Sequence, residues 1–310
     1  MSVTDTALAE RFSEHRDHLV GVAYRLTGSR SDAEDAVQEA WLRLSAVDEQ
    51  AREGIRELRA WLTTVVGRLC LDRLRSATAR RERYVGPWLP EPVVTPFGTA
   101  PSEDPLDIAV RDDGVRMAAL VVLDRLTPEQ RVALVLHDAF DLPFAEIAAT
   151  LGCTDATARQ HASRARRAVA QADPPPRIAL EEQREVLERF VAAIAAGDLS
   201  RVVALLHPDA ALIADSGGKA RAARRSVLGP DNIARFYLGL RRRYDELVFN
   251  GAPILVNGDL GAYLPPLPAG EAHHGRDARV ATFAIRDGLI YAIYDIANPD
   301  KLTGLNLPTP

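Results

Sequence analysis

The sequence predicts a multidomain chain in which two all-α domains are followed by an α+β domain. Apolar residues recur at helical spacing through residues 7–83 and again through 112–172. Proline-rich segments without any period interrupt this pattern at 85–107 and at 173–176. Strand-like segments occur only after the second interruption. At 310 residues the chain is also too long for one ordinary domain, so two or three domains are expected.

Composition and charge indicate a globular protein that is not coated with basic residues. Hydrophobic residues make up 47% of the chain, which is enough for real cores, and the formal net charge is −5. This charge argues against a uniformly basic surface but leaves room for a local basic patch. Cys70 and Cys153 lack metal-type neighbours, so we expect two small buried side chains in a reducing compartment. No signal pattern or membrane-length apolar run is found, so we expect a cytoplasmic protein without membrane contact.

The first helical block contains two well-marked helices. Ser31-Asp32-Ala33-Glu34 has the spacing of a capping box, and DAEDAVQEAWLRL follows with apolar residues at helical spacing. The second helix, LRAWLTTVVGRLCLDRLRSATARRERY, has an apolar side that includes Trp61 and Leu62. The arginines that lie along this second helix or just past its end include Arg68, Arg73, Arg75, Arg80, Arg81 and Arg83.

The second helical block contains a helix-turn-helix pattern. Thr127-Pro128-Glu129-Gln130 places a cap, an N1 proline and a glutamine at N3, which together mark a helix start. In FAEIAATLGCTDATARQHASRARRAVA, a helix over Phe144–Leu151 is expected to turn at Gly152, which can supply the positive φ of the bend. Thr154 can cap the helix that follows.

The second helix of this pattern has a small apolar face and a basic polar face. The expected inward face comprises Ala158, Ala162, Ala165 and Val169. The expected outward face comprises Arg159, Gln160, His161, Ser163, Arg164 and Arg167. Arginine and glutamine can read base edges in the major groove, and arginine, serine and threonine can hold phosphates. The clustered arginines favour DNA binding over the alternative, which is a solvated helix in a helical bundle.

The last third of the chain is predicted to be an α+β domain. EEQREVLERFVAAIAAGDLSRVVALL predicts two helices joined by a Gly-Asp turn, and a third helix is predicted over Asp231–Tyr244. His207-Pro208-Asp209 is expected to form a turn at a helix end. Asp287-Gly288 is a hairpin turn signal between the last two strand-like segments. These segments are ALIAD, ELVFNGAPILVNG, LGAYLPPL, RVATFAI and LIYAIYDI.

Several of these segments resemble a known family of bacterial transcription proteins. AYRLTGSRSDAEDAVQEAWLRL followed by RAWLTTVVGRLCLDRLRS is similar to region 2 of sigma-70-type factors of the extracytoplasmic-function (ECF) class. LTPEQRVALVLHDAFDLPFAEIAATLGCTDATARQHASRARRAV is similar to their region 4. WLPEP, Asp215-Ser216-Gly217-Gly218-Lys219 and Asn298-Pro299-Asp300-Lys301-Leu302 resemble motifs of the subgroup with a C-terminal SnoaL-like domain. The expected domains are therefore sigma region 2 (1–84), a linker (85–111), sigma region 4 (112–172), a proline-rich linker (173–177) and a SnoaL-like, NTF2-like cone (178–310).

The resemblance implies a sigma factor that binds RNA polymerase core through the β′ and β subunits and opens promoter DNA without making a bond itself. Contacts with the β′ clamp helices would come from Asp32, Asp35, Gln38, Trp41 and Leu42. Contacts with the −10 element would come from Trp61, Arg68, Arg73, Arg75, Arg80 and Arg81. Contacts with the −35 element would come from Thr154, Thr157, Arg159, Gln160, His161, Ser163, Arg164 and Arg167. Without the resemblance, the acidic face and the arginines would be interpreted as solvated helix surface.

The chain departs from many relatives of this family at Arg68 and at the start of the predicted −35 helix. They carry Asn in place of Arg68 and Pro-Val-Gly-Thr in place of residues 154–157, so the resemblance implies roles but no base preference.

The SnoaL-like resemblance keeps an enzyme or a sensor open as an alternative. In that cone fold a curved sheet wraps a cavity where many relatives bind or convert small hydrophobic molecules, so a cavity ligand is an implied partner. Acid–base candidates are His207, Asp215, His273, His274 and Asp295. We expect no catalytic residues, cofactor or metal, because none of these lies in a convincing acid–base or ligand pattern. The alternative is a ligand-sensing one-component DNA-binding regulator, or a SnoaL-type enzyme with a DNA-binding appendage.

The Asp-Ser-Gly-Gly-Lys loop does not fit a Walker-type phosphate loop. Such a loop needs an upstream glycine and a Ser or Thr after the lysine, whereas this chain has Ile213 and Ala220 there. The glycines fit a strand-end turn. However, the chain's only two lysines, Lys219 and Lys301, fall in the two motifs of the fused subgroup. We predict regulatory contacts in cis with region 2 and the linker from Trp88, Leu89, Pro90, Asp215, Gly217, Gly218, Lys219, Asn298, Pro299, Asp300 and Lys301.

Overall fold

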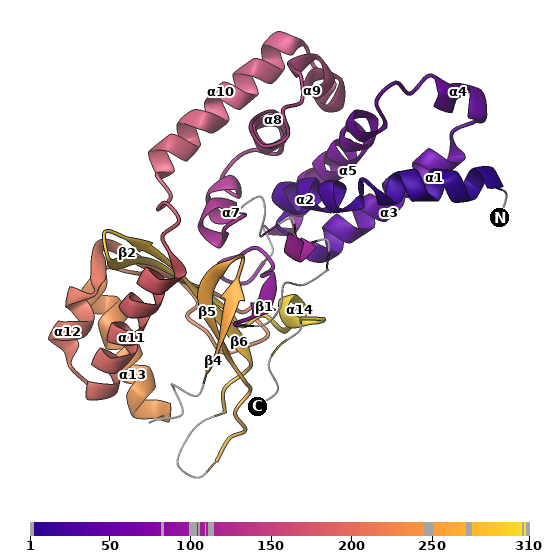
Figure 1. Cartoon of the computed structure of the whole chain (residues 1–310). Coiled ribbons are helices and arrows are strands. Elements are labelled where there is room, and N and C mark those ends of the chain that lie inside the picture. Colours follow the sequence, from indigo (N-terminus) through magenta and orange to yellow (C-terminus); the bar gives the residue numbers. More distant parts are fainter. Residues whose placement is uncertain are drawn as a thin grey trace. The chain divides into compact units, whose positions relative to one another are not determined.

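The computed structural model shows two compact units, coloured along the chain in Figure 1. It describes residues 3–81, 84–98, 104, 106–108, 110, 115–244, 251–270, 275–305 and 307. The helical unit contains the described parts of 1–82, 102–115 and 119–174. The sheet unit contains the described parts of 83–101, 116–118 and 175–310. Among the described residues, no helix combines the length and the apolar character needed to cross a membrane.

The helical unit is built from two groups of helices that match the two predicted all-α domains. The first group is α1 (Val3–Ser13), α2 (Arg16–Thr27), α3 (Arg30–Ala46), α4 (Glu49–Glu53) and α5 (Leu58–Arg81). The second group is α7 (Met117–Leu123), whose first two residues cluster with the sheet unit, α8 (Pro128–Asp138), α9 (Phe144–Leu151) and α10 (Asp155–Ala172). Fully buried side chains such as Leu19, Tyr24, Leu44 and Leu62 form the core of the first group.

Local capping chemistry sets the helix starts of this unit. Thr127 forms the predicted capping box at α8, with its side chain accepting from the Gln130 amide and the Gln130 side chain accepting from the Thr127 amide. The capping box predicted at Ser31 is wrong. Gly28 ends α2 with φ of 68°, and the extended Ser29 then caps α3 by accepting from the Asp32 amide at 3.1 Å. The helix therefore begins before Ser31.

The sheet unit has one seven-stranded sheet in its described part, with strand order β1-β4-β5-β6-β7-β2-β3. All neighbouring strands are antiparallel except β2 and β7, which are parallel. The strands are β1 (Val94–Pro96), β2 (Leu206–Asp215), β3 (Val227–Leu228), β4 (Ala252–Val256), β5 (Asp259–Leu264), β6 (Arg279–Arg286) and β7 (Leu289–Ile296). The predicted hairpin turn between β6 and β7 is confirmed, with positive φ at Asp287 and Gly288.

Three helices cover one face of this sheet and provide its core. They are α11 (Leu180–Ala196), α12 (Leu199–Ala204) and α13 (Pro230–Tyr244), which lie together in Figure 1. Phe190 of α11 and Ile233 of α13 pack with Leu212 of β2 and Ile293 of β7. Burial of these side chains stabilises the layers by roughly 1.5–3 kcal/mol each. A short helix, α14 (Pro299–Leu302), follows β7.

Three local predictions differ from the structure. The predicted linker contains strand β1, which pairs with β4 of the sheet unit, because its apolar Val94 meets the apolar Val256 across the ladder. His207-Pro208-Asp209 lies within β2 and not in a helix-end turn.

Cys70 is buried as expected, and burial raises the pKa of its thiol to about 12. Cys153 is only partly buried, because it follows the exposed Gly152 at the turn between α9 and α10.

Candidate functional site

The predicted DNA-reading helix α10 presents its polar face to solvent. Gly152 has φ of 67°, and the Thr154 side chain caps α10 by accepting from the Thr157 amide at 3.3 Å. Ala158, Ala162 and Ala165 are fully buried, so the opposite face of α10 is turned outward. The exposed members of the predicted outward face are Thr154, Arg159, Gln160, Arg164 and Arg167, while Thr157, His161, Ser163 and the inward Val169 are partly buried. This arrangement gives α10 a basic surface of a size and chemistry suited to a DNA groove.

Polar and aromatic contacts fix α10 against α8 and α9. Arg166 Nε donates to Asp138 Oδ2 at 2.8 Å, and the guanidinium lowers the pKa of that carboxyl. The Arg159 guanidinium lies 5.2 Å from the centroid of the Phe144 ring, which in turn stacks on His137. The outward face is thus held on a rigid support.

The predicted −10 arginines of α5 contact the second group of helices. Arg68 Nη2 donates to the carbonyl oxygen of Ala149 at 3.0 Å, and Arg75 Nη2 lies 3.0 Å from Glu129 Oε1. Arg73 lies within α5's own group, 3.8 Å from both Asp32 and Glu39 carboxylates. Trp61 is partly buried. The side chains of Arg80 and Arg81 lie outside the described residues.

A close approach of helices underlies these contacts. A Cβ on Gly67 of α5 would lie 3.1 Å from Leu136 Cδ1 and 3.3 Å from Thr150 Cγ2, so only glycine fits here without displacement. Arg131 of α8 is 1% exposed and donates from Nε to the carbonyl oxygen of Arg25 in α2 at 3.3 Å. The two predicted DNA-binding groups therefore pack against each other inside the helical unit.

The predicted core-docking face of α3 is exposed and includes an unusual apolar residue. Asp35, Gln38 and Leu42 are exposed, and the Leu42 side chain is 57% exposed, while Asp32 is partly buried. The partly buried Trp41 ring lies 5.2 Å from the Phe12 ring of α1. Gln38 and Trp41 also line a groove of about 450 Å³ between α1 and α3. An acidic helix with an exposed leucine and an aromatic anchor is suited to docking on a protein.

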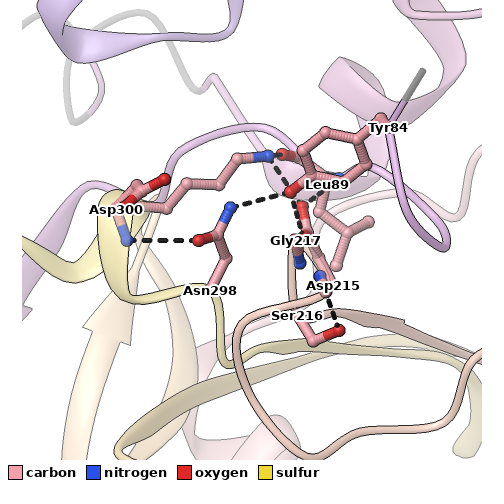
Figure 2. A network of polar contacts seen from close by, with 9 residues as sticks. Tyr84, Leu89, Asp215, Ser216, Gly217, Asn298 and Asp300 are labelled. Carbon is pink, nitrogen blue, oxygen red and sulfur yellow. Dashed lines mark hydrogen bonds and ion pairs between the residues drawn. The ribbon is translucent and has the colours of Figure 1, made fainter. Parts of the chain in front are cut away.

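The sheet unit contains a buried polar network around Asp215, shown in Figure 2. We call this network, made by Tyr84, Leu89, Asp215, Asn298 and Lys301, the linker clasp. Asp215 is fully buried, and its Oδ1 accepts from the Tyr84 hydroxyl at 2.5 Å. Its Oδ2 accepts from the Leu89 amide at 2.8 Å and from Lys301 Nζ at 2.7 Å. Both oxygens of the buried carboxylate thus accept hydrogen bonds, which offsets the free-energy cost of removing the charge from water.

Lys301 lies in a cation site made by the segment around Trp88. Its ammonium also donates to the carbonyl oxygen of Leu89 and lies 4.1 Å from the Trp88 ring centroid and 5.5 Å from that of Tyr84. Burial, and then the hydrogen bond to Asp215, raise the pKa of Tyr84, so its hydroxyl stays a donor. The clasp therefore holds the segment from Tyr84 to the buried Pro90 by charge, hydrogen bonds and ring contacts together.

The glycines of the predicted motif are required by the close fit of the clasp. Gly217 has φ of +56°, and a Cβ there would lie 2.6 Å from Asn298 Nδ2. Gly218 has φ of +73°, and a Cβ there would lie 3.0 Å from Val85 Cβ. The Asn298 amide donates to the Tyr84 hydroxyl at 2.7 Å, and its oxygen caps α14, with Pro299 at the first turn. At both glycines the turn after β2 needs positive φ, and a neighbouring side chain lies too close for a Cβ to fit freely.

The two lysines have different environments. Lys219 Nζ pairs with Asp300 Oδ2 at 2.5 Å, and the two side chains are 55% and 62% exposed. Asp215 and both lysines were predicted as regulatory contacts, and Lys301 is the one that pairs with Asp215. The other acid–base candidates do not form one site. His207 packs against the Tyr291 ring, Asp295 lines a separate cavity, and His273 and His274 lie outside the described residues.

A second buried group in the sheet unit was not anticipated. Arg116 Nε donates to Asp259 Oδ2 at 2.8 Å and Nη1 donates to the Pro175 carbonyl oxygen at 2.6 Å. Gln183 donates to Asp259 Oδ1 at 3.2 Å. The backbone N–H of Asn257 donates to the Val93 carbonyl oxygen at 2.8 Å, and the Asn257 side-chain Oδ1 accepts from the Val93 backbone N–H at 3.2 Å. We call the contacts of Arg116, Asp259 and Gln183 the Arg116 anchor. In the sequence, the Arg116 anchor is indicated only by an Asn-Gly-Asp turn and by Arg116, which nothing distinguishes from the many other arginines.

Comparisons with known proteins account for each part of the chain. The Sigma-70 region 2 family matches residues 11–80, the Sigma-70 region 4 family matches 116–169, and the SnoaL-like domain family matches 187–293. The ECF RNA polymerase sigma factor SigJ of Mycobacterium tuberculosis is 52% identical over 300 residues, which cover 94% of this chain and 92% of SigJ. A probable ECF RNA polymerase sigma factor of the same organism, SigI, is 39% identical over 64% of this chain and 66% of its own length.

The solved structures agree with the sequence comparison. The crystal structure of M. tuberculosis SigJ superposes with a TM-score of 0.80 at 50% identity, covering 97% of this chain and 100% of that one. The helical groups, the sheet with its covering helices and their order along the chain all have counterparts in these matches. This chain belongs to the extracytoplasmic-function RNA polymerase sigma factors.

Proposed function

We propose that this chain directs RNA polymerase core to promoters, using α10 at the −35 element and α5 at the −10 element. The observation that supports this most strongly is the exposed basic face of α10 behind a buried alanine face. The exposed Asp35, Gln38 and Leu42 of α3, beside Trp41, are the proposed contacts with the β′ clamp helices. In this proposal the chain supplies recognition and strand opening, and it makes no bond itself.

We infer that the helical unit must open before both promoter elements can be read. Arg68 and Arg75 of α5 contact Ala149 and Glu129 of the second helical group. A phosphate or an unstacked base cannot take these donors while they are held there. Binding of core would stabilise an arrangement in which the two groups are apart, and so release α5.

We further propose that the SnoaL-like domain acts in cis by holding the linker. The clasp fixes the Tyr84–Pro90 segment, and the Arg116 anchor fixes the residues that precede α8. These two contacts lie at the two ends of the connection between the two DNA-binding helical groups. A domain that holds both ends of a connection limits how far those groups can separate.

In vitro transcription with purified core over a promoter library tests the main proposal. Replacing Arg164 of the α10 face by Ala should lower promoter-specific transcription about 5- to 150-fold, the effect of losing a base or phosphate contact worth about 1–3 kcal/mol. The matched control is Arg189→Ala on the exposed face of α11. Unchanged transcription by Arg164→Ala, Arg159→Ala and the double variant would refute the role of α10.

A second assay separates the sigma factor from a one-component regulator. A sigma factor co-purifies with core polymerase, whereas a repressor or activator shifts promoter DNA without it. Replacing Leu42 by Glu should weaken core binding while the free protein keeps its stability, because Leu42 is already exposed. Full retention of core binding by this variant would contradict the α3 assignment.

A further inference from the structure

A cavity of about 240 Å³ lies inside the sheet unit, apart from the linker clasp. Its apolar wall comes from β2, α13, β5 and β6 through Leu212, Phe236, Tyr237, Leu240, Leu264 and Ala281. This volume equals that of about eight liquid water molecules, so it suits a molecule with one ring or a short chain. Apolar walls with a few polar groups are the usual composition of a small-molecule site.

The polar part of the cavity lining is dominated by arginine. Arg221, Arg243, Arg276 and Arg279 line the cavity, and Asp295 is the one carboxylate among its lining residues. Arg276 is 6% exposed, and its Nη2 donates to the Pro265 carbonyl oxygen at 3.2 Å. At the rim, the exposed Asp277 accepts from the Arg221 amide at 2.8 Å. The excess of guanidinium groups favours an anionic ligand over a cationic or neutral one.

Arg279 and Asp295 keep unused hydrogen-bonding capacity at this wall. Arg279 Nη1 donates to Asp295 Oδ2 at 3.0 Å, and Arg279 Nη2 donates to the Arg221 carbonyl oxygen at 2.8 Å. Arg279 Nε and Asp295 Oδ1 are buried and have no hydrogen-bond partner within the described residues. Asp295 as a whole is 8% exposed. A buried polar atom without a partner is unfavourable, and a ligand with a matching polar group would remove that cost.

The surroundings of Asp295 are compatible with the same kind of ligand. Burial raises the pKa of its carboxyl, the Arg279 guanidinium opposes this, and the Asp215 charge adds to the rise. A raised pKa favours the uncharged carboxyl, which repels an anionic ligand less than a carboxylate does. Burial also raises the pKa of the Tyr237 phenol.

We propose that this cavity binds a small organic carboxylate whose single ring or short chain lies against α13. Its carboxylate accepts a hydrogen bond from Arg279 Nε, and Arg276 adds positive charge. The apolar body lies against Phe236, Leu240 and Ala281.

Such a ligand would also be placed to act on the linker clasp, and this extension rests on the proposed function. Leu212 and Asp215 lie on the same strand, β2, and Asp295 of β7 is paired with Ala214, next to Asp215. The loop after β2 carries Lys219, which pairs with Asp300, and then Arg221 to Ala223, which line the cavity. Binding in the cavity would therefore restrain the loop after β2 and the ends of β2 and β7, next to the clasp.

The full-length protein titrated with 4-fluorobenzoate and followed by ¹⁹F NMR tests the proposal. We expect saturable binding, with 4-fluorobenzyl alcohol at least about tenfold weaker and 4-fluorobenzylamine without saturable binding. Ala281→Phe, which fills the cavity, should abolish 4-fluorobenzoate binding, and Arg279→Gln should weaken it at least about tenfold. The matched control is Arg242→Gln, an exposed arginine of α13 outside the cavity lining, which should bind like the original chain.

Three results would overturn the proposal. They are no saturable binding of 4-fluorobenzoate by the folded chain, equal binding of the amine, and undiminished binding by Ala281→Phe. The variants are checked by thermal melting, and Ala281→Phe serves where Arg279→Gln does not fold. Failure of the ligand test with normal core-dependent transcription overturns the cavity inference alone, whereas loss of α10-dependent transcription bears on the proposed function.

Discussion

The contacts of α5 with α8 and α9 differ in kind from those of the linker clasp. Arg75 in the helical unit is 49% exposed in its side chain and pairs with a carboxylate that is 29% exposed. Lys301 and Asp215 in the clasp are 7% and 0% exposed. An exposed ion pair contributes about 0–1 kcal/mol, but removal of one partner from a buried pair costs about 3–5 kcal/mol.

This difference suggests which contacts can open during function. The arginines of α5 are held by weak, solvent-screened contacts that a polyanion such as DNA can replace. The polar atoms of the clasp are buried and hydrogen-bonded to one another, so solvent and ions compete poorly for these contacts. We therefore expect the helical groups to separate while the linker stays on the sheet unit.

The largest expected effect is the loss of the clasp cation. Lys301→Met leaves the Asp215 carboxylate buried without its ion-pair partner and should destabilise the sheet unit by about 3–5 kcal/mol in urea denaturation. Lys219→Met, the matched control, removes only an exposed pair and should cost less than about 1 kcal/mol. The double variant Asp215→Asn with Lys301→Met should recover much of the loss. Equal effects of the two single lysine variants would contradict the comparison.

A smaller effect is expected from the glycine that contacts Asn298. Gly217→Ala combines positive φ with a collision against Asn298 Nδ2 and should cost about 2–3 kcal/mol. Gly304→Ala has a similar φ of +75° but open space around its Cβ, so it should cost only about 1 kcal/mol. Thermal melts of both variants measure the difference. Identical melting temperatures would mean that the Asn298 contact adds nothing.

The helical interface should respond differently to overpacking. Gly67→Leu must displace Leu136 and Thr150, and we expect a loss of about 1–3 kcal/mol in the contact of the two groups. Because that contact competes with core binding, the variant should bind core polymerase more tightly, by several-fold. Gly239→Leu on α13, with open space around its Cβ, is the control. Weaker core binding by a folded Gly67→Leu chain would contradict an interface that must open.

The smallest effect concerns pH. Burial, then the charges of Arg59, His15 and Arg25, lower the pKa of His18 from 6.5 to about 4. As pH falls, His18 is protonated in the unfolded chain at a higher pH than in the folded chain. Neutral His18 therefore contributes its full stability to the fold above about pH 6.5, and this contribution is lost as pH falls towards 4. We expect the helical unit to lose about 1–2 kcal/mol between pH 7 and 5. His18→Gln should flatten this part of the profile, and an unchanged profile would exclude His18 as its cause.

Features encoded by neighbouring residues could be predicted from the sequence. The Thr127 capping box, the turn at Gly152 and the hairpin at Asp287-Gly288 depend on chemistry within a few residues, and each is present. The Ser31 box had the right residue types in the wrong place. The positive φ of Gly28 decides where α3 begins, so Ser29 caps the helix in place of Ser31.

Long-range pairings could not be predicted in the same way. Leu89, Asp215, Asn298 and Lys301 of the clasp were predicted as regulatory contacts, but Tyr84 was not. The choice of Lys301 over Lys219 as the partner of Asp215 depends on the close fit of α14. Strand β1 is three residues long and pairs with β4, more than 150 residues later in the chain. The Arg116 anchor joins segments of similar separation. None of these contacts leaves a periodic signal, because the fold alone brings the partners together.

Distances measured by double electron–electron resonance, with and without core polymerase, test the central claim. One spin-label pair, on Ser45 of α3 and Gln171 of α10, reports on the helical groups. The other pair, on Phe97 beyond β1 and Leu228 of β3, reports on the linker against the sheet unit. Cys153→Ser removes the partly exposed native thiol, while Cys70 is buried. Core should lengthen the first distance and leave the second unchanged; a constant first distance, or a second that lengthens with it, would contradict the account.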